Sequence, residues 1–250
     1  MLSAVANSVA PDQSASRDSG AAPGKGASLD DIVFLVDVDN TLLDNDRFLS
    51  DLRERLEQSF GALQAERFWQ IFNARRQELG LADYLGTLQL FRAGVDDLPQ
   101  LLQMSDFLLD YPFSSLVFPE ARAVITHLGD CGKTVLLSDG DMVFQPRKIR
   151  SSGLWDAVSG RVLIYVHKEK VLDDVQQRYP AAHYVVVDDK PNLLAAMKRV
   201  LRRKLTTVFV RQGQYALAPD ADRYEPSPDR VIERIGDLIN LTFSDFQVPT

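Results

Sequence analysis

The sequence predicts an α/β fold, in which a doubly wound parallel sheet carries a helical domain inserted after its first strand. From residue 119 onward, short apolar runs alternate with segments of helical periodicity. That alternation is typical of parallel strands joined by helices that cover both faces of the sheet. An earlier apolar run, residues 32–36, is separated from the others by residues 44–112, which are almost wholly helical in pattern. The inserted domain is therefore expected between the first strand and the rest of the sheet.

The first strand ends in two carboxylates. Residues 32–36 form a continuous apolar run, which predicts a strand buried on both faces. Asp37 and Asp39 follow it, and in extended backbone residues two apart project to the same side. Both carboxylates are thus expected at the carboxyl edge of the sheet, where open α/β sheets bind their ligands.

Two like charges this close repel each other unless a cation or a shared proton relieves them. The pair Asp37 and Asp39 therefore predicts one of two kinds of site. Either the carboxylates hold a metal ion, or one acts as an acid beside another that acts as a nucleophile.

The inserted segment shows helical spacing throughout. Leu52, Leu56 and Phe60 recur every four residues, and Gly61 is a plausible stop. Further helices are expected at residues 65–78, 83–92 and 98–109. Two prolines, Pro112 and Pro119, then bracket a short connection back to the sheet.

The second half of the chain supplies the rest of the sheet and its covering helices. Strands are expected at residues 133–137, 161–166, 183–187 and 206–210. Helices are expected at residues 121–128, 145–152, 170–178, 193–203 and 228–241. The predicted organisation is a tail at 1–28, a core formed by 29–43 with 113–250, and a helical domain at 44–112. The tail is rich in Ala, Ser, Gly and Pro, so it is expected to be disordered and not a secretory signal.

Composition excludes several classes of protein. The 250 residues include 28 basic and 35 acidic side chains, a net charge of −7, which argues against a nucleic-acid partner. The single cysteine, Cys131, excludes an intramolecular disulfide and fits a reducing, cytoplasmic location. No apolar stretch approaches the roughly 20 residues that span a bilayer, so no membrane partner is expected.

Polar side chains follow four of the expected strands. Because parallel strands place their carboxyl ends at one edge, these side chains are expected to converge there. They are two acidic residues, a hydroxyl with a glycine turn, a lysine and a second acidic pair: Asp37 and Asp39, Ser138 and Gly140, Lys168 or Lys170, and Asp188 and Asp189.

This order of motifs resembles that of the haloacid dehalogenase-like hydrolase superfamily. Residues 37–42 (DVDNTL) match its first motif and residues 136–140 (LLSDG) its second. A lysine near position 168 matches the third, and residues 185–189 (VVVDD) match the fourth. The resemblance covers roughly residues 30–241. It implies a Rossmann-like core, an α-helical cap domain, and Mg²⁺-dependent phosphoryl transfer through an aspartyl phosphate.

The resemblance also implies roles for individual residues. Asp37 is expected to attack phosphorus, and Asp39 to protonate the leaving oxygen and later activate water. Ser138 and the backbone of Gly140 are expected to hydrogen-bond the phosphoryl oxygens. The lysine is expected to pair with Asp37, and Lys168 is favoured over Lys170 because it comes directly after the strand.

Mg²⁺ is the cofactor that the resemblance implies. It takes oxygen ligands, and it would neutralise the repulsion between an anionic nucleophile and an anionic substrate. Its expected ligands are Asp37, the backbone carbonyl of Asp39, Asp188 and, directly or through water, Asp189.

Other residues are candidates for substrate binding. Thr41 is expected either to contact the phosphate or to cap a helix. Specificity is expected in the cap, where Arg75 and Tyr84, together with Arg47 and Arg76, could hold a substrate anion or ring.

The expected function is hydrolysis of a small phosphorylated metabolite. An aspartate at position 39 favours phosphate-ester hydrolysis over dehalogenation, because a leaving halide needs no proton. A phosphomutase or another phosphotransferase would use the same residues and stays open as an alternative. The third hypothesis, a binding protein without catalytic activity, is disfavoured because Asp37, Asp39, a lysine and Asp188 are all present.

Overall fold

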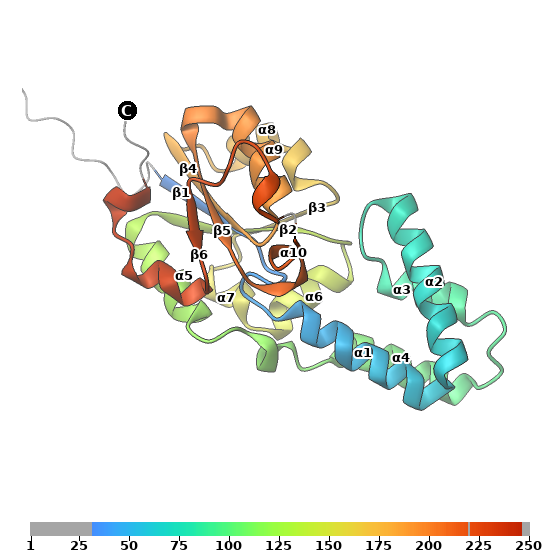
Figure 1. The fold of residues 1–250 in the computed structure, drawn as a ribbon. Coiled ribbons are helices and arrows are strands. Elements are labelled where there is room, and N and C mark those ends of the chain that lie inside the picture. The colour runs from blue at the N-terminus through green and yellow to red at the C-terminus, as the bar shows by residue number, and fades with distance from the viewer. Residues whose placement is uncertain (1–31, 220, 247–250) are drawn as a thin grey trace, which may run out of the picture.

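A single parallel sheet forms the centre of the molecule (Figure 1). The computed structural model describes residues 32–219 and 221–246, so the predicted tail at 1–28 lies outside the described residues. Within them the strands follow the order β3-β2-β1-β4-β5-β6, and every neighbouring pair is parallel. The strands are β1 (Ile32–Val36), β2 (Lys133–Asp139), β3 (Val162–Tyr165), β4 (His183–Asp188), β5 (Leu205–Val210) and β6 (Arg230–Ile232). The predicted α/β fold class is confirmed.

Strand β1 lies between β2 and β4 and is buried along its whole length. Phe34 and Val36 pack into one apolar cluster, whereas Val33 and Leu35 pack into another on the opposite face. A strand covered on both faces needs apolar side chains at successive positions, which explains the uninterrupted run in the sequence. The flanking helices are α5 (Ala121–Cys131), α6 (Phe144–Ser151), α7 (Leu154–Ala157), α8 (Leu172–Arg178), α9 (Pro191–Leu201) and α10 (Gly213–Ala216).

The inserted helices extend away from the sheet as a separate arm, drawn in blue to green in Figure 1. They are α1 (Asn45–Phe60), α2 (Ala62–Leu79), α3 (Tyr84–Phe91) and α4 (Leu98–Asp110). Gly61 has a φ of 79° and separates α1 from α2, as the sequence predicts. At the base of the arm, the ring of Phe48 contacts those of Tyr84, Phe113 and Phe144. These aromatic contacts join the inserted domain to α6 of the core.

The prediction of a final helix at residues 228–241 is wrong. The segment instead forms the short edge strand β6 and a 3-10 helix, η6 (Ile235–Asn240). The Asp229 carboxylate accepts hydrogen bonds from the backbone and the hydroxyl of Thr207, at 2.8 and 3.0 Å. These bonds hold the chain beside β5, where its backbone pairs with the edge of the sheet instead of forming a helix. The remaining 3-10 helices are η2 (Phe113–Leu116), η3 (Lys168–Lys170), η4 (Arg202–Lys204), η5 (Ala221–Arg223) and η7 (Phe243–Phe246).

None of the helices in the described part of the chain combines the length and the apolar character that crossing a membrane requires.

Candidate active site

The turn that follows β1 fixes the first two carboxylates. The backbone N–H of Asp37 donates to the carbonyl of Val187 at 2.9 Å, so Asp37 still continues the sheet. Asn40 then adopts a φ of 60°, and its side-chain oxygen accepts hydrogen bonds from the backbone N–H groups of Asn45 and Asp46 at 3.0 and 3.1 Å. The chain therefore passes directly from Asp37 into the first cap helix, and Asp39 lies at the junction.

Lys168 is buried against the nucleophile candidate. Its ammonium forms an ion pair with Asp37 and a second one with Asp188 at 2.6 Å. Its backbone N–H donates to the Asp139 carboxylate at 2.8 Å, which fixes the turn after β3. Lys170 is exposed. Of the two lysines that the sequence left open, the structure brings Lys168 to Asp37.

Three carboxylates converge beside this lysine. Oxygens of Asp37, Asp188 and Asp189 lie within 4.8 Å of one another, and all three residues are buried. One oxygen of Asp37 and both oxygens of Asp189 have no hydrogen-bond partner among the described residues. A hard cation accepts such oxygens as ligands, so this donor set fits Mg²⁺. The Asp39 carboxylate is not part of this cluster.

Burial and mutual repulsion disfavour the charged forms of the two acids on β4 and the loop after it. Burial raises the pKa of Asp188 to about 6, with repulsion from Asp37 adding to it and the attraction of Lys168 opposing it. Burial, then repulsion from Asp188 and Asp37, raises the pKa of Asp189 well above its usual range. Burial alone would lower the pKa of Lys168, but the charges of Asp188 and Asp37 outweigh it and raise that pKa. Among the described residues, the three carboxylates of the cluster therefore outnumber the one ammonium, Lys168, that contacts them.

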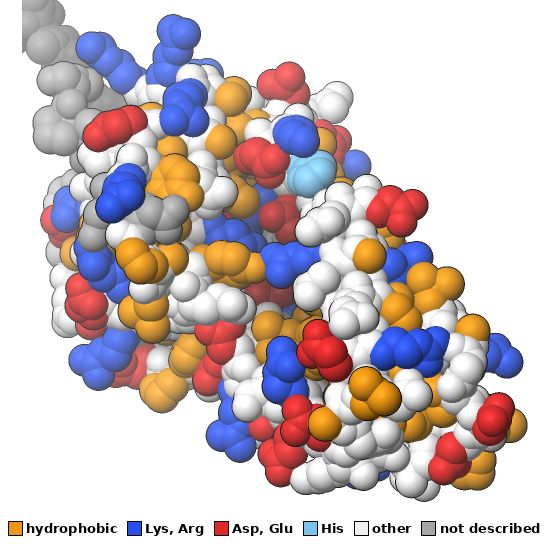
Figure 2. Space-filling view, turned by 45° about the vertical axis from the view of Figure 1, so that its right-hand side comes forward, with side chains coloured by type: hydrophobic (Ala, Val, Ile, Leu, Met, Phe, Trp, Pro, Cys, Tyr) orange, Lys and Arg blue, Asp and Glu red, His pale blue; other side chains and the backbone are white. Residues whose placement is uncertain are grey.

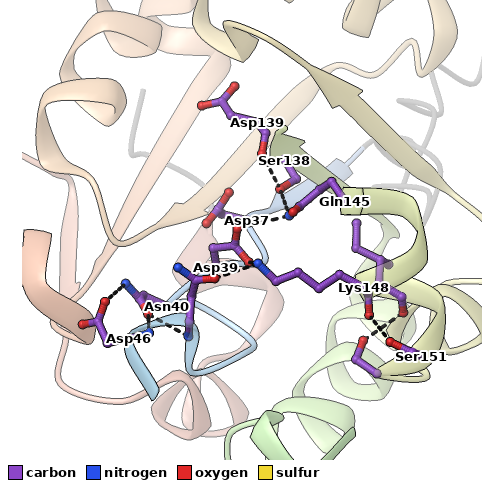
Figure 3. A network of polar contacts seen from close by, with 12 residues as sticks. Asp37, Asp39, Asn40, Asp46, Ser138, Asp139, Gln145, Lys148 and Ser151 are labelled. Carbon is purple, nitrogen blue, oxygen red and sulfur yellow. Dashed lines mark hydrogen bonds and ion pairs between the residues drawn. The ribbon is translucent and has the colours of Figure 1, made fainter. Parts of the chain in front are cut away.

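Asp39 is held by two side chains of α6, a helix that the sequence predicts but whose Gln145 and Lys148 were not among the predicted site residues (Figure 3). One of its oxygens pairs with the Lys148 ammonium at 2.5 Å, and the other accepts a hydrogen bond from the Gln145 amide at 3.2 Å. Both partners lie on α6, whose start is capped by Asp141 through the backbone N–H groups of Val143 and Phe144, each at 2.8 Å. The signal in the sequence was only a Gln and a Lys three residues apart, on one helix face.

The remaining core candidates, Ser138, Gly140 and Thr41, differ in whether their polar groups have hydrogen-bond partners within the protein. Ser138 is buried, and its hydroxyl accepts a hydrogen bond from the Gln145 amide at 2.9 Å. The backbone N–H of Gly140 donates to the carbonyl of Tyr165 at 2.9 Å, so within the protein it is already engaged. Thr41 does not cap α1, because Asp44 does so. The buried Thr41 hydroxyl has no hydrogen-bond partner among the described residues.

A cavity of about 870 Å³ opens between the core and the inserted helices. Figure 2 shows this recess, with acidic and basic side chains around it. Its core wall includes Asp39, Gly140, Gln145 and Lys190. Its cap wall includes Arg53, Trp69, Phe72, Arg76 and Tyr84, and Tyr215 of α10 also lines it. Arg53, Trp69, Lys190 and Tyr215 were not among the residues predicted from the sequence.

The cap candidates separate into two groups. Tyr84 and Arg76 line the cavity, and Arg76 donates a hydrogen bond to the hydroxyl of Tyr215 across the gap between cap and core. Arg75 is not among the cavity-lining residues: its guanidinium binds the Asp83 carboxylate, with one contact at 2.9 Å. Arg47 likewise is not among them and pairs with Asp51 at 2.8 Å.

Comparisons with known proteins show the family and the fold of the chain. The crystal structure of a protein from Burkholderia xenovorans, described as a haloacid dehalogenase-like hydrolase, has 57% sequence identity and a TM-score of 0.79, and it covers 85% of this chain and 99% of its own. YfnB of Bacillus subtilis, described as a HAD-hydrolase bound to magnesium, has 15% identity and a TM-score of 0.58 over 83% of this chain and 96% of its own. A Thermotoga maritima protein described as a β-phosphoglucomutase has 15% identity and a TM-score of 0.57 over 84% and 97%.

The last two similarities show the fold alone. No protein-family model and no curated protein matches the sequence.

Proposed function

Because the chain belongs to the haloacid dehalogenase-like hydrolase family, we propose that it hydrolyses a small phosphomonoester with the help of Mg²⁺. The observation that carries this proposal is the environment of Asp37. One of its oxygens is bound by Lys168, and the other has no hydrogen-bond partner among the described residues. Because Lys168 orients the carboxylate and its second oxygen is unpartnered, Asp37 can offer one oxygen to a metal ion and the other to phosphorus.

Asp37, Asp188 and Asp189 would hold the metal ion, together with the backbone carbonyl of Asp39. A Mg²⁺ ion held there would supply positive charge that offsets the repulsion between the carboxylates and an anionic phosphoryl group. The excess of carboxylates over cations in this cluster supports the assignment.

In the first step, Asp37 forms a bond to phosphorus while the bond from phosphorus to the leaving oxygen breaks. The leaving oxygen takes a proton from Asp39, which acts as the general acid. Lys168 orients Asp37, because its ammonium contacts the Asp37 carboxylate.

In the second step, water attacks phosphorus and gives a proton to Asp39. The bond between phosphorus and Asp37 breaks, which releases inorganic phosphate and restores both carboxyl groups. We assign the buried hydroxyl groups of Thr41 and Ser138 to the phosphoryl oxygens. The leaving group would lie in the cavity beneath the cap, which Tyr84 and Arg76 line.

Asp39 is the feature that favours a phosphatase within this family, because an alkoxide leaving group needs a proton. The site itself recognises a phosphorylated small molecule. We expect neither a nucleic acid nor a membrane as a partner, and we expect the protein to act in the cytoplasm.

The test is phosphate release from a panel of phosphomonoesters, with and without Mg²⁺, by the wild-type protein and the Asp37→Asn variant. We expect Mg²⁺-dependent release that the variant loses by a factor of about 10³ or more, while its circular dichroism spectrum is unchanged. Wild-type activity in Asp37→Asn would refute the nucleophile assignment.

A second measurement distinguishes a phosphatase from a phosphotransferase. The same reactions are repeated with added alcohols and sugar phosphates as acceptors. Inorganic phosphate as the sole phosphorylated product supports hydrolysis, whereas a phosphorylated acceptor would make the protein a phosphotransferase.

A further inference from the structure

Lys148 is a buried lysine to which the proposed mechanism gives no role. It lies on α6 with only 1% of its side chain exposed. Its ammonium contacts the Asp39 carboxylate at 2.5 Å and donates a hydrogen bond to the Asn45 side chain at 2.7 Å (Figure 3). It also lies 6.0 Å from the ring centre of Phe48 and 5.7 Å from that of Phe113.

This contact differs from an ordinary surface ion pair. Removing an ammonium from water costs free energy unless charged or polar partners replace the water. Here those partners are one carboxylate and one amide oxygen, and aromatic rings close the remaining sides. The exposed pair Arg47 with Asp51 is 65% and 26% exposed and has no such constraint. The position of Lys148 therefore depends on Asp39 and Asn45.

Asp39 also depends on Lys148. Its side chain is 25% exposed, in contrast to 2% for Asp37, so packing alone does not fix the Asp39 carboxylate. Lys148 binds one oxygen and Gln145 the other, and both side chains come from the same helix. Without the ammonium, the carboxylate would keep one neutral hydrogen bond and could turn toward the cavity.

The third partner connects this pair to the cap. Asn45 is the first residue of α1, and α1 is the first helix of the inserted domain. The Lys148 ammonium is thus the point where a core helix, Asp39 and the start of the cap meet.

We propose that Lys148 is a positioning residue, which fixes the Asp39 carboxylate for proton transfer. Because Lys148 also binds Asn45, the orientation of the Asp39 carboxylate then depends on the position of the cap helix α1. The inference rests on the proposed function, because it presumes that Asp39 exchanges a proton with the substrate. Proton transfer requires heavy atoms within hydrogen-bond reach, so a carboxylate free to rotate spends less time in the productive position. The loss is expected in the rate of the chemical step and not in substrate binding.

The test compares Lys148→Met with Lys198→Met. Lys198 is the matched control: it is also a largely buried lysine in an ion pair, at 2.7 Å from Asp229. It lies on α9, its ammonium also donates to the carbonyl of Leu205 on β5, and it is not among the cavity-lining residues. Single-turnover release of alcohol is measured for an alkyl phosphate, whose leaving group needs a proton, and for p-nitrophenyl phosphate, whose leaving group does not.

We expect Lys148→Met to slow alcohol release from the alkyl phosphate by about 10- to 100-fold, with KM changed less than about threefold. Release from p-nitrophenyl phosphate should change much less. Asn45→Ala should show the same selective loss to a smaller extent, and Lys198→Met should show none. Equal losses for the two esters, or none for the alkyl phosphate, would overturn the proposal.

A crystal structure of metal-free Lys148→Met gives a readout that does not need activity. We expect the Asp39 carboxylate to occupy a new orientation or several, whereas an unchanged, well-ordered Asp39 would contradict the inference. Should Lys148→Met fail to fold, Lys148→Gln and Asn45→Ala provide the same comparison. If the wild-type protein released no phosphate from any ester, the proposed function would fail, and the orientation of Asp39 would still decide the role of Lys148.

Discussion

The side chains around Lys168 carry more negative than positive charge. Asp37, Asp188 and Asp189 are all buried within reach of one another, and the Lys168 ammonium contacts two of them. Lys190 adds a second cation nearby, and the charge of Asp37 contributes to the raised pKa of Lys190 against the opposing effect of burial. Each buried charge is stabilised by the opposite charges around it, so removing one should lower both the stability and the activity of the protein.

Replacing Lys168 by methionine tests this dependence. The change leaves the carboxylates of Asp37 and Asp188 without their ammonium, and breaking a buried pair in this way typically costs about 3–5 kcal/mol. We expect urea unfolding at neutral pH to show a loss in the free energy of unfolding of that order, together with loss of phosphate release. Lys170→Met is the matched control on the exposed side of the same turn, and it should change stability by less than about 0.5 kcal/mol. Similar effects of the two substitutions would contradict this account of Lys168.

The sequence predicted those site residues that follow directly from a strand end. Asp37, Asp188 and Asp189 continue buried strands, so the direction of the sheet is enough to bring them together. Lys148 and Gln145 could not be found in this way. They lie on a helix that also carries Arg147 and Arg150, and only the packing of α6 against the cap base decides which cation is buried.

Helix α2 presents two successive arginines to different surroundings. Arg75 binds Asp83, the residue that caps α3, whereas Arg76 reaches across the cavity to the Tyr215 hydroxyl of α10. One arginine thus stabilises the cap itself, and the other lies between the cap and the core.

The two arginines should therefore respond differently to alanine substitution. We expect Arg76→Ala to raise KM for the best substrate by about tenfold, a loss of about 1.4 kcal/mol of binding, because Arg76 lines the cavity. We expect Arg75→Ala to leave KM unchanged and to lower the free energy of unfolding by about 1 kcal/mol, since it breaks a half-buried ion pair next to a helix cap. Steady-state kinetics and urea unfolding of both variants check this, and a larger KM effect for Arg75→Ala would reverse the assignment.

Periodicity predicted the strands and most helices within a few residues, but it failed at residues 228–241. That segment has apolar residues at helical spacing. It does not form a helix because the Asp229 carboxylate accepts hydrogen bonds from Thr207. The partner is 22 positions away along the chain. A pattern read in a short window contains no information about such a contact.

At the scale of the whole molecule, the cavity exists because an insertion lies beside the carboxyl edge of the sheet. The sequence predicted the insertion from its uninterrupted helical pattern. It could not predict which faces of α1 and α2 line the cavity, because Arg53 and Trp69 fit equally well on an exposed helix face. The guanidinium of Arg53 lies 4.8 Å from the ring centre of Trp69, a contact that depends on how the two helices cross.

Mg²⁺ should stabilise the folded protein by an amount that depends on pH, because the carboxyl groups of this site also bind protons. Burial raises the pKa of Asp188 to about 6 and that of Asp189 above its usual range, so the folded metal-free protein binds these protons more tightly than the unfolded chain does. The contribution of Asp188 to the free energy of unfolding is full below the ordinary carboxyl pKa of about 4 and is lost as the pH rises through about 6.

Mg²⁺ has to displace the proton of Asp188, so its affinity should fall about tenfold for each pH unit below about 6. At a concentration 100 times its dissociation constant at neutral pH, Mg²⁺ should stabilise the protein by about 2.7 kcal/mol, which raises Tm by roughly 5–10 °C. Near pH 5 the same concentration should give about half that shift or less. Thermal unfolding with and without Mg²⁺ at the two pH values measures this difference. In Asp189→Asn the shift should be small at both, because the variant lacks one of the three converging carboxylates. A Tm shift of equal size at both pH values in the wild-type protein would mean that Asp188 and Asp189 do not hold the ion.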